Sequence, residues 1–328
     1  MYRNYKIVPF IPAGRKKTMM ILFNYFEKFA DIIDEVQIWQ NTKNAEDLAW
    51  FKQVADNNPK YKIYKVPEAY RFIDNPVQYN TGRFYEYTTD PDTIYVRFDD
   101  DIVYIDDDYF KNILDFRIDN PEYFLVFGNI WNNAITSYIQ QKQGKLHDEI
   151  CTVERPYCMD MCGWGNAKFA EYIHNVLLGK IEEGKVSDLY FNNDKLTPEG
   201  VYLLDAYRFS ISNFAYFGKD FQDFPKGAGK LDFNTKYHGI NAGIPVAGFA
   251  TDPADDAYPD EEIWLTEIHP LRTGRKNVIL GNAIVSHFTF SPYQKKHIVE
   301  NTDIYDRYQM LSEKKLSEEY YKKLQPHV

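Results

Sequence analysis

Residues 93–105 constrain the fold more than any other part of the sequence. Ile94, Val96 and Phe98 alternate with more polar residues along 93–98, which is the period of a β-strand. The strand runs directly into three consecutive carboxylates at positions 99–101, and a second apolar run follows at 102–105. We therefore expect this segment to form a buried strand whose end carries an acidic cluster.

The acidic cluster favours a metal site. Adjacent like charges at a strand end raise the free energy unless a cation neutralises them. If the backbone stays extended, Asp99 and Asp101 point the same way and offer carboxylate oxygens to a hard divalent cation, which can bridge to a diphosphate. A solvated acidic turn is the alternative, and the apolar runs on both sides disfavour it.

Length and charge limit the possible classes of protein. The chain has 328 residues, which fits two domains or one large α/β domain with insertions, and 44% of them are hydrophobic, enough for a sizeable core. The net charge is −10, from 38 Lys+Arg and 48 Asp+Glu, which argues against a nucleic-acid partner. An anionic substrate would need local cations or a bound metal ion.

The first hundred residues alternate between strand and helix patterns. That order favours an α/β fold with a mostly parallel central sheet and helices on both faces, in which ligands lie beyond the carboxyl ends of the strands. Strands are expected at 6–11, 36–39, 62–66 and 93–98, with helices at 19–33 and after an Asn44 cap. The loop 12–17, Asn41 and the acidic cluster should therefore meet at one edge.

The later part of the chain gives fewer signals. A helix is expected at 109–116, where the acids 106–108 would cap it, and another from an Asn166 cap to Gly179. Apolar strands are expected at 123–127 and 278–285. The tail 311–328 has the charge spacing of a solvated terminal helix.

Several polar residues are candidates for the site. Arg15, between the first strand and the first helix, can meet an anion there, and Arg83 can reach a phosphate or a base; a basic turn and a surface helix are their structural alternatives. His287 follows a late apolar strand and is either a structural residue or a metal ligand. The acid-rich segment 252–262 can supply a general base.

Three cysteines do not make a disulfide framework, which favours free thiols in a reducing compartment. A structural zinc ion held by His147, Cys151, Cys158 and Cys162 remains an alternative. The sequence shows neither a signal-peptide pattern nor an apolar run of transmembrane length, so the predicted location is cytoplasmic.

Four features in order resemble the nucleotide-sugar-dependent glycosyltransferases of the GT-A fold. They are the strand–loop–helix start at 7–15, Arg83 before the acidic strand, the Asp-x-Asp motif at 99–101, and a late strand followed by His287. The last is similar to the C-terminal histidine that completes the metal site in many members. The resemblance covers about residues 5–130 and 255–292.

The resemblance implies a role for each matching residue. Asp99 would contact the ribose or the sugar, and Asp99, Asp101 and His287 would hold Mn²⁺ or Mg²⁺, which stabilises the diphosphate leaving group. Pro12, Arg15, Asn41, Arg83 and Asp100 would border the nucleotide part of the donor. Glu261 or Asp256 would be the base of an inverting enzyme, but the many acids there give no clear choice, so retaining chemistry stays open.

The expected protein is thus a cytoplasmic, metal-dependent hexosyl- or pentosyltransferase. It would move a sugar from a nucleotide diphosphate donor to a glycan hydroxyl, in surface polysaccharide or glycoprotein-glycan synthesis. One GT-A-like domain would span 1–310, with a nucleotide-sugar half at 1–130 and an acceptor half at 131–310, before the charged helix 311–328. The rivals are a nucleotidylyltransferase acting on sugar phosphates and a non-catalytic carbohydrate-binding protein.

Overall fold

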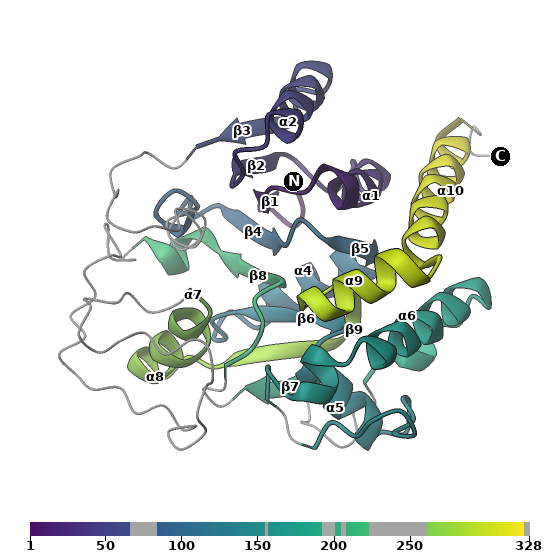
Figure 1. Cartoon of the computed structure of the whole chain (residues 1–328). Coiled ribbons are helices and arrows are strands. Elements are labelled where there is room, and N and C mark those ends of the chain that lie inside the picture. The colour runs from purple at the N-terminus through teal and green to yellow at the C-terminus, as the bar shows by residue number, and fades with distance from the viewer. Residues whose placement is uncertain (66–83, 155–156, 192–200, 205–207, 223–260, 325–328) are drawn as a thin grey trace.

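The computed structural model describes residues 1–65, 84–154, 157–191, 201–204, 208–222 and 261–324 (Figure 1). Within these ranges the chain forms one central sheet with helices packed against it. The predicted α/β class, with a parallel sheet core covered on both faces, is confirmed. Arg83 and Asp256, two of the predicted site residues, lie outside the described residues.

Nine described strands form the sheet in the order β3-β2-β1-β4-β8-β6-β9-β5, and β7 pairs with β9. The strands are β1 (Lys6–Ala13), β2 (Val36–Gln40), β3 (Tyr61–Tyr64), β4 (Thr93–Phe98), β5 (Ile102–Ile105), β6 (Val126–Trp131), β7 (Val201–Leu204), β8 (Asn213–Phe217) and β9 (Asn277–His287).

The described α-helices are α1 (Lys16–Lys28), α2 (Ala45–Asn57), α4 (Tyr109–Asp119), α5 (Ala134–Lys142), α6 (Ala167–Glu182), α7 (Glu261–Ile263), α8 (His269–Thr273), α9 (Pro292–Asn301) and α10 (Ile304–Leu324). The short 3₁₀ segments are η1 (Phe84–Glu86), η3 (Val186–Leu189) and η5 (Gly218–Phe221), and the π-helical turns are η2 (Met161–Gly165) and η7 (Trp264–Ile268).

The parallel part of the sheet carries the candidate site. Strands β3, β2, β1 and β4 run parallel, and the predicted alternation of strand and helix produces this order. Strand β8 then runs antiparallel between β4 and β6, while β9 is parallel to β6. The carboxyl ends of β1, β2, β4 and β9 therefore all lie at the edge where the polar candidates are found.

Side chains of β4 alternate between two covered faces. Phe98 contacts Phe26 of α1 and Phe110 of α4, so these helices cover one face. On the other face Arg97 pairs with Glu261 at the start of α7, and Tyr95 stacks on Tyr216 of β8. Because all six residues of β4 are buried, the alternation seen in the sequence separates two packed faces rather than a core face from a solvent face.

Two predicted helix caps are confirmed. The Asn44 side chain accepts hydrogen bonds from the backbone N–H groups of Glu46 and Asp47 at 2.8 and 3.3 Å. The Asn166 side chain accepts one from Phe169 at 3.0 Å. The predicted end of that helix at Gly179 is wrong, because α6 continues to Glu182 and a left-handed Gly184 follows it.

The acids 106–108 do not cap α4 through their side chains. Asp106 instead accepts hydrogen bonds from Tyr104 and Tyr190, and Asp107 forms ion pairs with Lys28 and Lys315. Except for Tyr104, these partners come from distant parts of the chain, so a local capping rule could not reveal them.

The C-terminal helix is longer and more deeply packed than its charge pattern predicts. It begins at Ile304, before the predicted boundary at 311, and Tyr308 is fully buried. Asn24 of α1 donates to Ser312 at 3.0 Å, and Tyr305 donates to the Lys17 carbonyl at 3.0 Å. The first half of α10 is therefore part of the folded unit, beside α1 in Figure 1.

Cys151 and Cys162 form a disulfide, so the expectation of three free thiols is wrong, and so is the zinc alternative that needed both sulfurs. Cys158 is buried and lies outside this bond. The pairing depends on the fold of 151–162 around the turn η2, which the cysteine spacing alone did not indicate.

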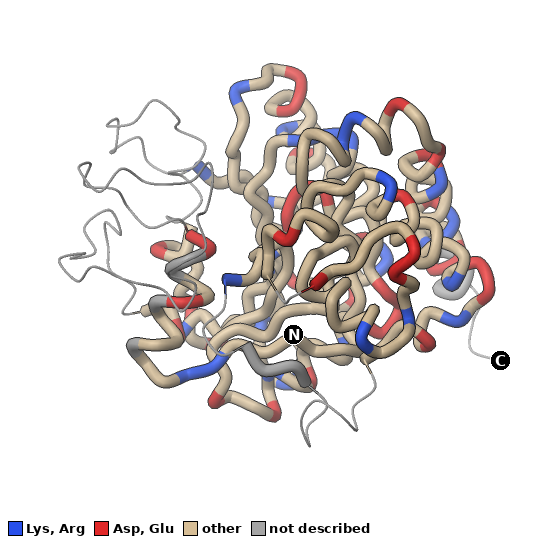
Figure 2. The backbone as a smooth tube through the Cα atoms, turned by 60° about the horizontal axis from the view of Figure 1, so that its bottom comes forward, with Lys and Arg blue, Asp and Glu red and all other residues tan. Residues whose placement is uncertain are grey.

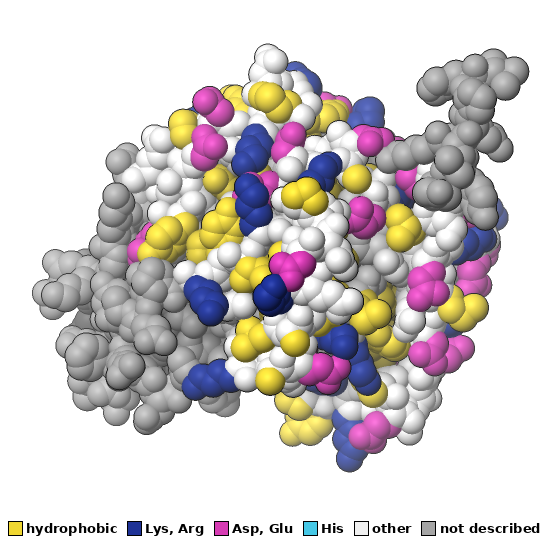
Figure 3. Space-filling model, turned by 90° about the horizontal axis from the view of Figure 1, so that it is seen from above, with side chains coloured by type: hydrophobic (Ala, Val, Ile, Leu, Met, Phe, Trp, Pro, Cys, Tyr) yellow, Lys and Arg dark blue, Asp and Glu magenta, His cyan; other side chains and the backbone are white. Residues whose placement is uncertain are grey.

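Charged residues are distributed along the whole described chain (Figure 2). On the face shown in Figure 3, basic and acidic side chains are interspersed. Among the described helices, none combines the length and apolar character needed to cross a membrane.

Candidate metal centre

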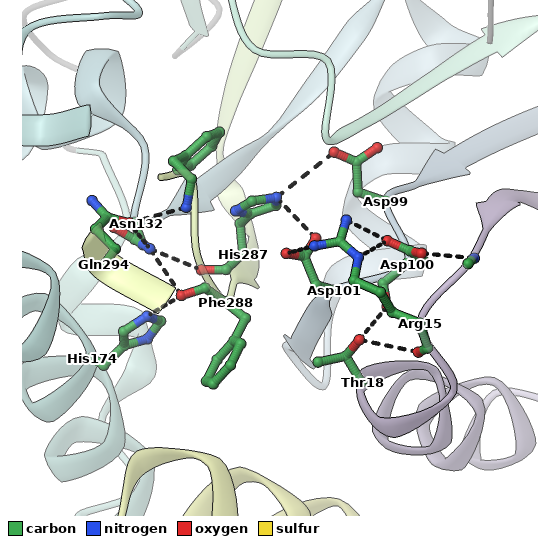
Figure 4. A network of polar contacts seen from close by, with 12 residues as sticks. Arg15, Thr18, Asp99, Asp100, Asp101, Asn132, His174, His287, Phe288 and Gln294 are labelled. Carbon is green, nitrogen blue, oxygen red and sulfur yellow. Dashed lines mark hydrogen bonds and ion pairs between the residues drawn. The ribbon is translucent and has the colours of Figure 1, made fainter. Parts of the chain in front are cut away.

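Three possible metal ligands converge beyond the ends of β4 and β9 (Figure 4). His287 Nε2 lies 3.0 Å from Asp101 Oδ1 and 3.7 Å from Asp99 Oδ2. One donor atom from each of the three residues lies within 4.8 Å of the others. Asp101 and His287 are buried, and Asp99 is partly exposed, which leaves the cluster open on the side of Asp99. These residues can bind a metal ion.

The two carboxylates meet for a reason other than the one the sequence suggested. The backbone does not stay extended: it turns after Asp99, whose carbonyl accepts a hydrogen bond from Ile102 N–H at 3.2 Å. This turn lets the chain leave β4 and enter β5, which pairs with β9 and places Ile102 opposite His287. The turn and the pairing together bring both acids to the histidine.

The charges of the cluster are mutually dependent. Burial alone would lower the pKa of His287, but Asp101 and Asp99 outweigh it and raise that pKa to about 9. Burial alone would raise the pKa of Asp101, but Arg15 and His287 lower it to about 2. Burial alone would also raise the pKa of Asp99, but Arg97 and His287 outweigh burial, so the pKa is lowered. Each acid is thus ionised because a cationic group lies beside it.

The three candidate ligands, two carboxylates and one imidazole, suit a hard divalent cation that also accepts a nitrogen ligand. The buried Asp101 Oδ1 has His287 Nε2 as its close polar neighbour at 3.0 Å, and an ion bound to both atoms would replace that contact. Carboxylate oxygens suit Mg²⁺ and Mn²⁺, and imidazole suits the softer Mn²⁺. The cluster therefore fits the predicted Mn²⁺ or Mg²⁺.

Arg15 is a second charge at the site. Its guanidinium donates to Asp100 Oδ1 at 2.6 Å and to Asp101 Oδ2 at 2.5 Å. It is about half exposed, whereas both acids are buried, so one side of the guanidinium faces solvent. The prediction that Arg15 lies at this edge holds, and its present partners are the acids of the Asp-x-Asp motif.

Asp100 points away from the metal cluster and fixes the first loop. Its carboxylate accepts the Gly14 N–H at 2.8 Å, and its carbonyl accepts the Thr18 hydroxyl at 2.7 Å. Burial and the neighbouring carboxylates raise its pKa to about 6, although Arg15 opposes this shift. Asp100 thus ties the start of α1 to the end of β4.

Pro12 and Asn41 lie at the same edge. Pro12 pairs in register with Trp39 of β2, and the Asn41 N–H donates to the Ala13 carbonyl at 2.9 Å. The Asn41 side-chain oxygen is buried and has no hydrogen-bond partner among the described residues. The Asn41 carbonyl and the Asp100 carboxylate both lie against Gly14, where a Cβ would meet each of them at 3.4 Å. The loop, Asn41 and the acidic cluster therefore meet as predicted.

Arg97 is a buried residue of the site that the sequence reasoning did not single out. Its guanidinium lies 3.1 Å from Asp99 Oδ1 and 3.1 Å from Glu261 Oε1. The hydroxyl of Tyr85 donates to the same Glu261 oxygen at 2.7 Å. An arginine two residues before the motif, inside an otherwise apolar strand, was the available signal, because such a charge requires buried acidic partners.

Glu261, a predicted base, therefore lies near the cluster and is joined to Asp99 through Arg97. Asp256 and Arg83, the other candidates from the same reasoning, lie outside the described residues. The described site thus contains Asp99–Asp101, Arg15, Arg97, Glu261 and His287.

No protein-family model matches the chain, and no curated protein matches it in sequence. Among solved structures, one similar chain is the glucosyl-3-phosphoglycerate synthase from Mycobacterium tuberculosis in complex with phosphoglyceric acid. The sequence identity is 13%, the match covers 56% of this chain and 67% of that chain, and the TM-score is 0.31. At this level the likeness is coarse, and the side chains of the site are the basis for assigning its chemistry.

Proposed function

We propose that this protein is a metal-dependent glycosyltransferase with a GT-A-like fold. It transfers a hexosyl or pentosyl group from a nucleotide diphosphate sugar to a hydroxyl of a glycan acceptor. The observation that carries the proposal is the convergence of Asp99, Asp101 and His287 at the carboxyl edge of a parallel sheet, beside the loop that begins α1. In open α/β sheets, ligands bind beyond the carboxyl ends of the strands, at this edge.

In this proposal, each residue at the edge contacts a different part of the nucleotide sugar donor. Asp99, Asp101 and His287 would hold the ion, and Asp99, the more exposed acid, would also contact the ribose or the sugar. When bound, a divalent ion supplies Lewis-acid stabilisation of the diphosphate leaving group. Arg15 offers its solvent-facing side to the anionic donor. Pro12 and Asn41 would border the nucleoside, and Asp100 holds the first loop in place through Gly14. Arg83, which lies outside the described residues, is proposed from the sequence to reach a phosphate or the base.

The acid-rich segment 252–262 supplies the base in an inverting mechanism, and Glu261 and Asp256 are its candidates. Glu261 contacts Arg97 and Tyr85, which fix its carboxylate at the border of the site. A retaining enzyme would need neither residue as a base.

The pathway we propose is surface polysaccharide or glycoprotein-glycan synthesis. The cytoplasm is the location expected from the sequence, while the Cys151–Cys162 disulfide favours an oxidising compartment. The redox state of these cysteines in the isolated protein decides between the two locations.

The proposal is tested by calorimetric titration of nucleotide diphosphate sugars with and without Mn²⁺. We expect at least one nucleotide diphosphate sugar to bind the natural protein only when Mn²⁺ is present. In Asp101→Asn, the affinity for this donor should be lost, with or without Mn²⁺. Asp107→Asn, which changes an exposed acid on the neighbouring turn, is the matched control and should bind as the natural protein does. Unchanged donor affinity in Asp101→Asn would contradict the proposed site.

The products separate this function from its rivals. A glycosyltransferase releases a nucleoside diphosphate, whereas a nucleotidylyltransferase releases pyrophosphate from a nucleoside triphosphate and a sugar phosphate. A non-catalytic carbohydrate-binding protein would bind glycans with no need for nucleotide or metal.

A further inference from the structure

We propose that Asn132 is a positioning residue for His287, acting through the backbone that carries the imidazole into the metal cluster. The inference rests on the proposed metal site and adds a residue to it. Asn132 follows the end of β6, the strand that runs parallel to β9, and His287 is the last residue of β9. The two residues therefore come from neighbouring strand ends at the same edge.

The Asn132 amide lies across the end of β9. Its Nδ2 is 3.2 Å from the His287 carbonyl oxygen and 3.1 Å from the Phe288 carbonyl oxygen. It is also 3.3 Å from Gln294 Oε1, which accepts the Phe290 N–H at 3.0 Å (Figure 4). One buried amide thus contacts both carbonyls at the point where the strand ends.

Asn132 adopts a backbone conformation that few residues tolerate. Its φ is +60°, in the left-handed region, where asparagine is enriched among the non-glycine residues. This conformation ends β6 and reverses the chain into α5, whose N-cap is Asn133. Asparagine thus serves two needs here, because it tolerates the turn and supplies the amide.

The imidazole itself lacks the support that metal-binding histidines usually have. Such histidines normally donate their second ring N–H to a carboxylate, a carbonyl or water, which fixes the ring. The Nδ1 atom of His287 is buried and has no hydrogen-bond partner among the described residues. The ring is stacked on Phe290, with centroids 4.0 Å apart, and its Nε2 faces Asp101, so on the Nδ1 side the stacking and the position of the backbone fix its direction.

Besides Asn132, two other groups contact the backbone of Phe288, and neither replaces the contact at His287. Phe288 N–H donates to the Asp101 carbonyl at 2.9 Å, and His174 Nε2 lies 3.0 Å from the Phe288 carbonyl. Both act on Phe288. Among the described side chains, Asn132 is the one that contacts the carbonyl of His287 itself.

Asn129 provides a matched control. It lies on β6, three residues before Asn132, is fully buried, and donates through Nδ2 to the Gly281 carbonyl of β9 at 3.0 Å. It therefore makes the same kind of contact between the same two strands, but away from His287. Asn129→Ala should lower the thermal stability without affecting the metal ligands.

The test measures Mn²⁺ binding to the full chain by electron paramagnetic resonance, without nucleotide. We expect Asn132→Gly, which keeps the left-handed turn and removes the amide, to weaken Mn²⁺ binding about tenfold or more, the range found when outer ligand contacts are removed. Asn129→Ala should stay within about twofold of the natural protein. Pulsed measurements should show the ¹⁴N coupling of a bound imidazole in the natural protein, its loss in His287→Gln, and its loss or weakening in Asn132→Gly.

Asn132→Asp gives a second variant if the glycine variant does not fold, because aspartate tolerates the same φ and cannot donate to the carbonyls. Unchanged Mn²⁺ affinity and ¹⁴N coupling in the folded variant, with binding abolished by Asp101→Asn, would overturn the role of Asn132 alone. Mn²⁺ binding that neither Asp101→Asn nor His287→Gln weakens would instead overturn the proposed metal site, and with it this inference.

Discussion

Arg97 and Glu261 form a buried ion pair, with 3.1 Å between Nη1 and Oε1, that joins the strand bearing the acidic motif to the first residue of α7. The same guanidinium lies 3.1 Å from Asp99 on its other side. One arginine therefore neutralises an acid of the proposed metal cluster and an acid of the proposed acceptor side. Both sides of the site depend on this charge.

Replacing Arg97 should destabilise the protein strongly. Arg97→Gln leaves Asp99 and Glu261 without their cation in a buried setting, and loss of one partner from such pairs costs about 3–5 kcal/mol in the free energy of unfolding. Urea denaturation of the natural protein and of Arg97→Gln measures this difference in the free energy of unfolding. Arg3→Gln, which removes exposed pairs with Asp115 and Asp119, should lower the free energy of unfolding far less, because solvent screens these pairs. Equal costs for the two variants would contradict the assigned burial.

Glu261 and Asp256 can be separated by their effects on turnover. If one of them is the base, its amide variant should lower kcat by about 10²–10⁴-fold while the Mn²⁺ affinity stays unchanged, because a base acts on the acceptor and not on the ion. Glu261→Gln should also lower the unfolding free energy, since it removes a partner of Arg97. If both variants keep full kcat, the inverting mechanism is wrong and a retaining one is favoured.

His174 should make the stability depend on pH. Burial lowers its pKa from 6.5 to about 4, and it lies between the Phe288 carbonyl and the Tyr308 hydroxyl. The unfolded chain therefore binds a proton between pH 6.5 and 4 that the folded chain does not, so stability falls as the pH falls through this window, by about 3 kcal/mol in total. Chemical denaturation across this range should show a shallower fall for His174→Gln. Parallel curves for the two proteins would contradict the prediction.

The sequence predicted the parallel half of the fold because its signals are local. The strand patterns of 6–11, 36–39 and 93–98 and the caps Asn44 and Asn166 each depend on residues close in the chain. The meeting of Asp101 with Arg15 follows from the same alternation, because parallel strands end at one edge.

The remaining features depend on contacts between distant segments. The pairing of β9 with both β5 and β6 brings His287 to the acids, and the buried Arg97–Glu261 pair joins residues separated by half the length of the chain. Tyr308 packs α10 onto the core through His174, although the charge pattern of that helix indicated solvent. Amphipathic spacing reports which residues are apolar but does not say which partner a polar residue will meet.

Alkylation of the denatured protein tests the disulfide. Without reductant we expect one of the three cysteines, Cys158, to be modified, because Cys151 and Cys162 are bonded. After reduction all three should react, and peptide mass spectrometry identifies the sites. Modification of all three thiols without reductant, in protein isolated under conditions that preserve its redox state, would instead favour the cytoplasmic location.

An ion held by Asp99, Asp101 and His287 is the central requirement of the proposed chemistry. Anomalous diffraction from a crystal soaked with Mn²⁺ measures this directly. We expect a single strong peak between the Asp101 carboxylate and His287 Nε2, with Asp99 beside it, and its disappearance in Asp101→Asn. Full soaking with no peak beside these three side chains would contradict the proposed metal centre.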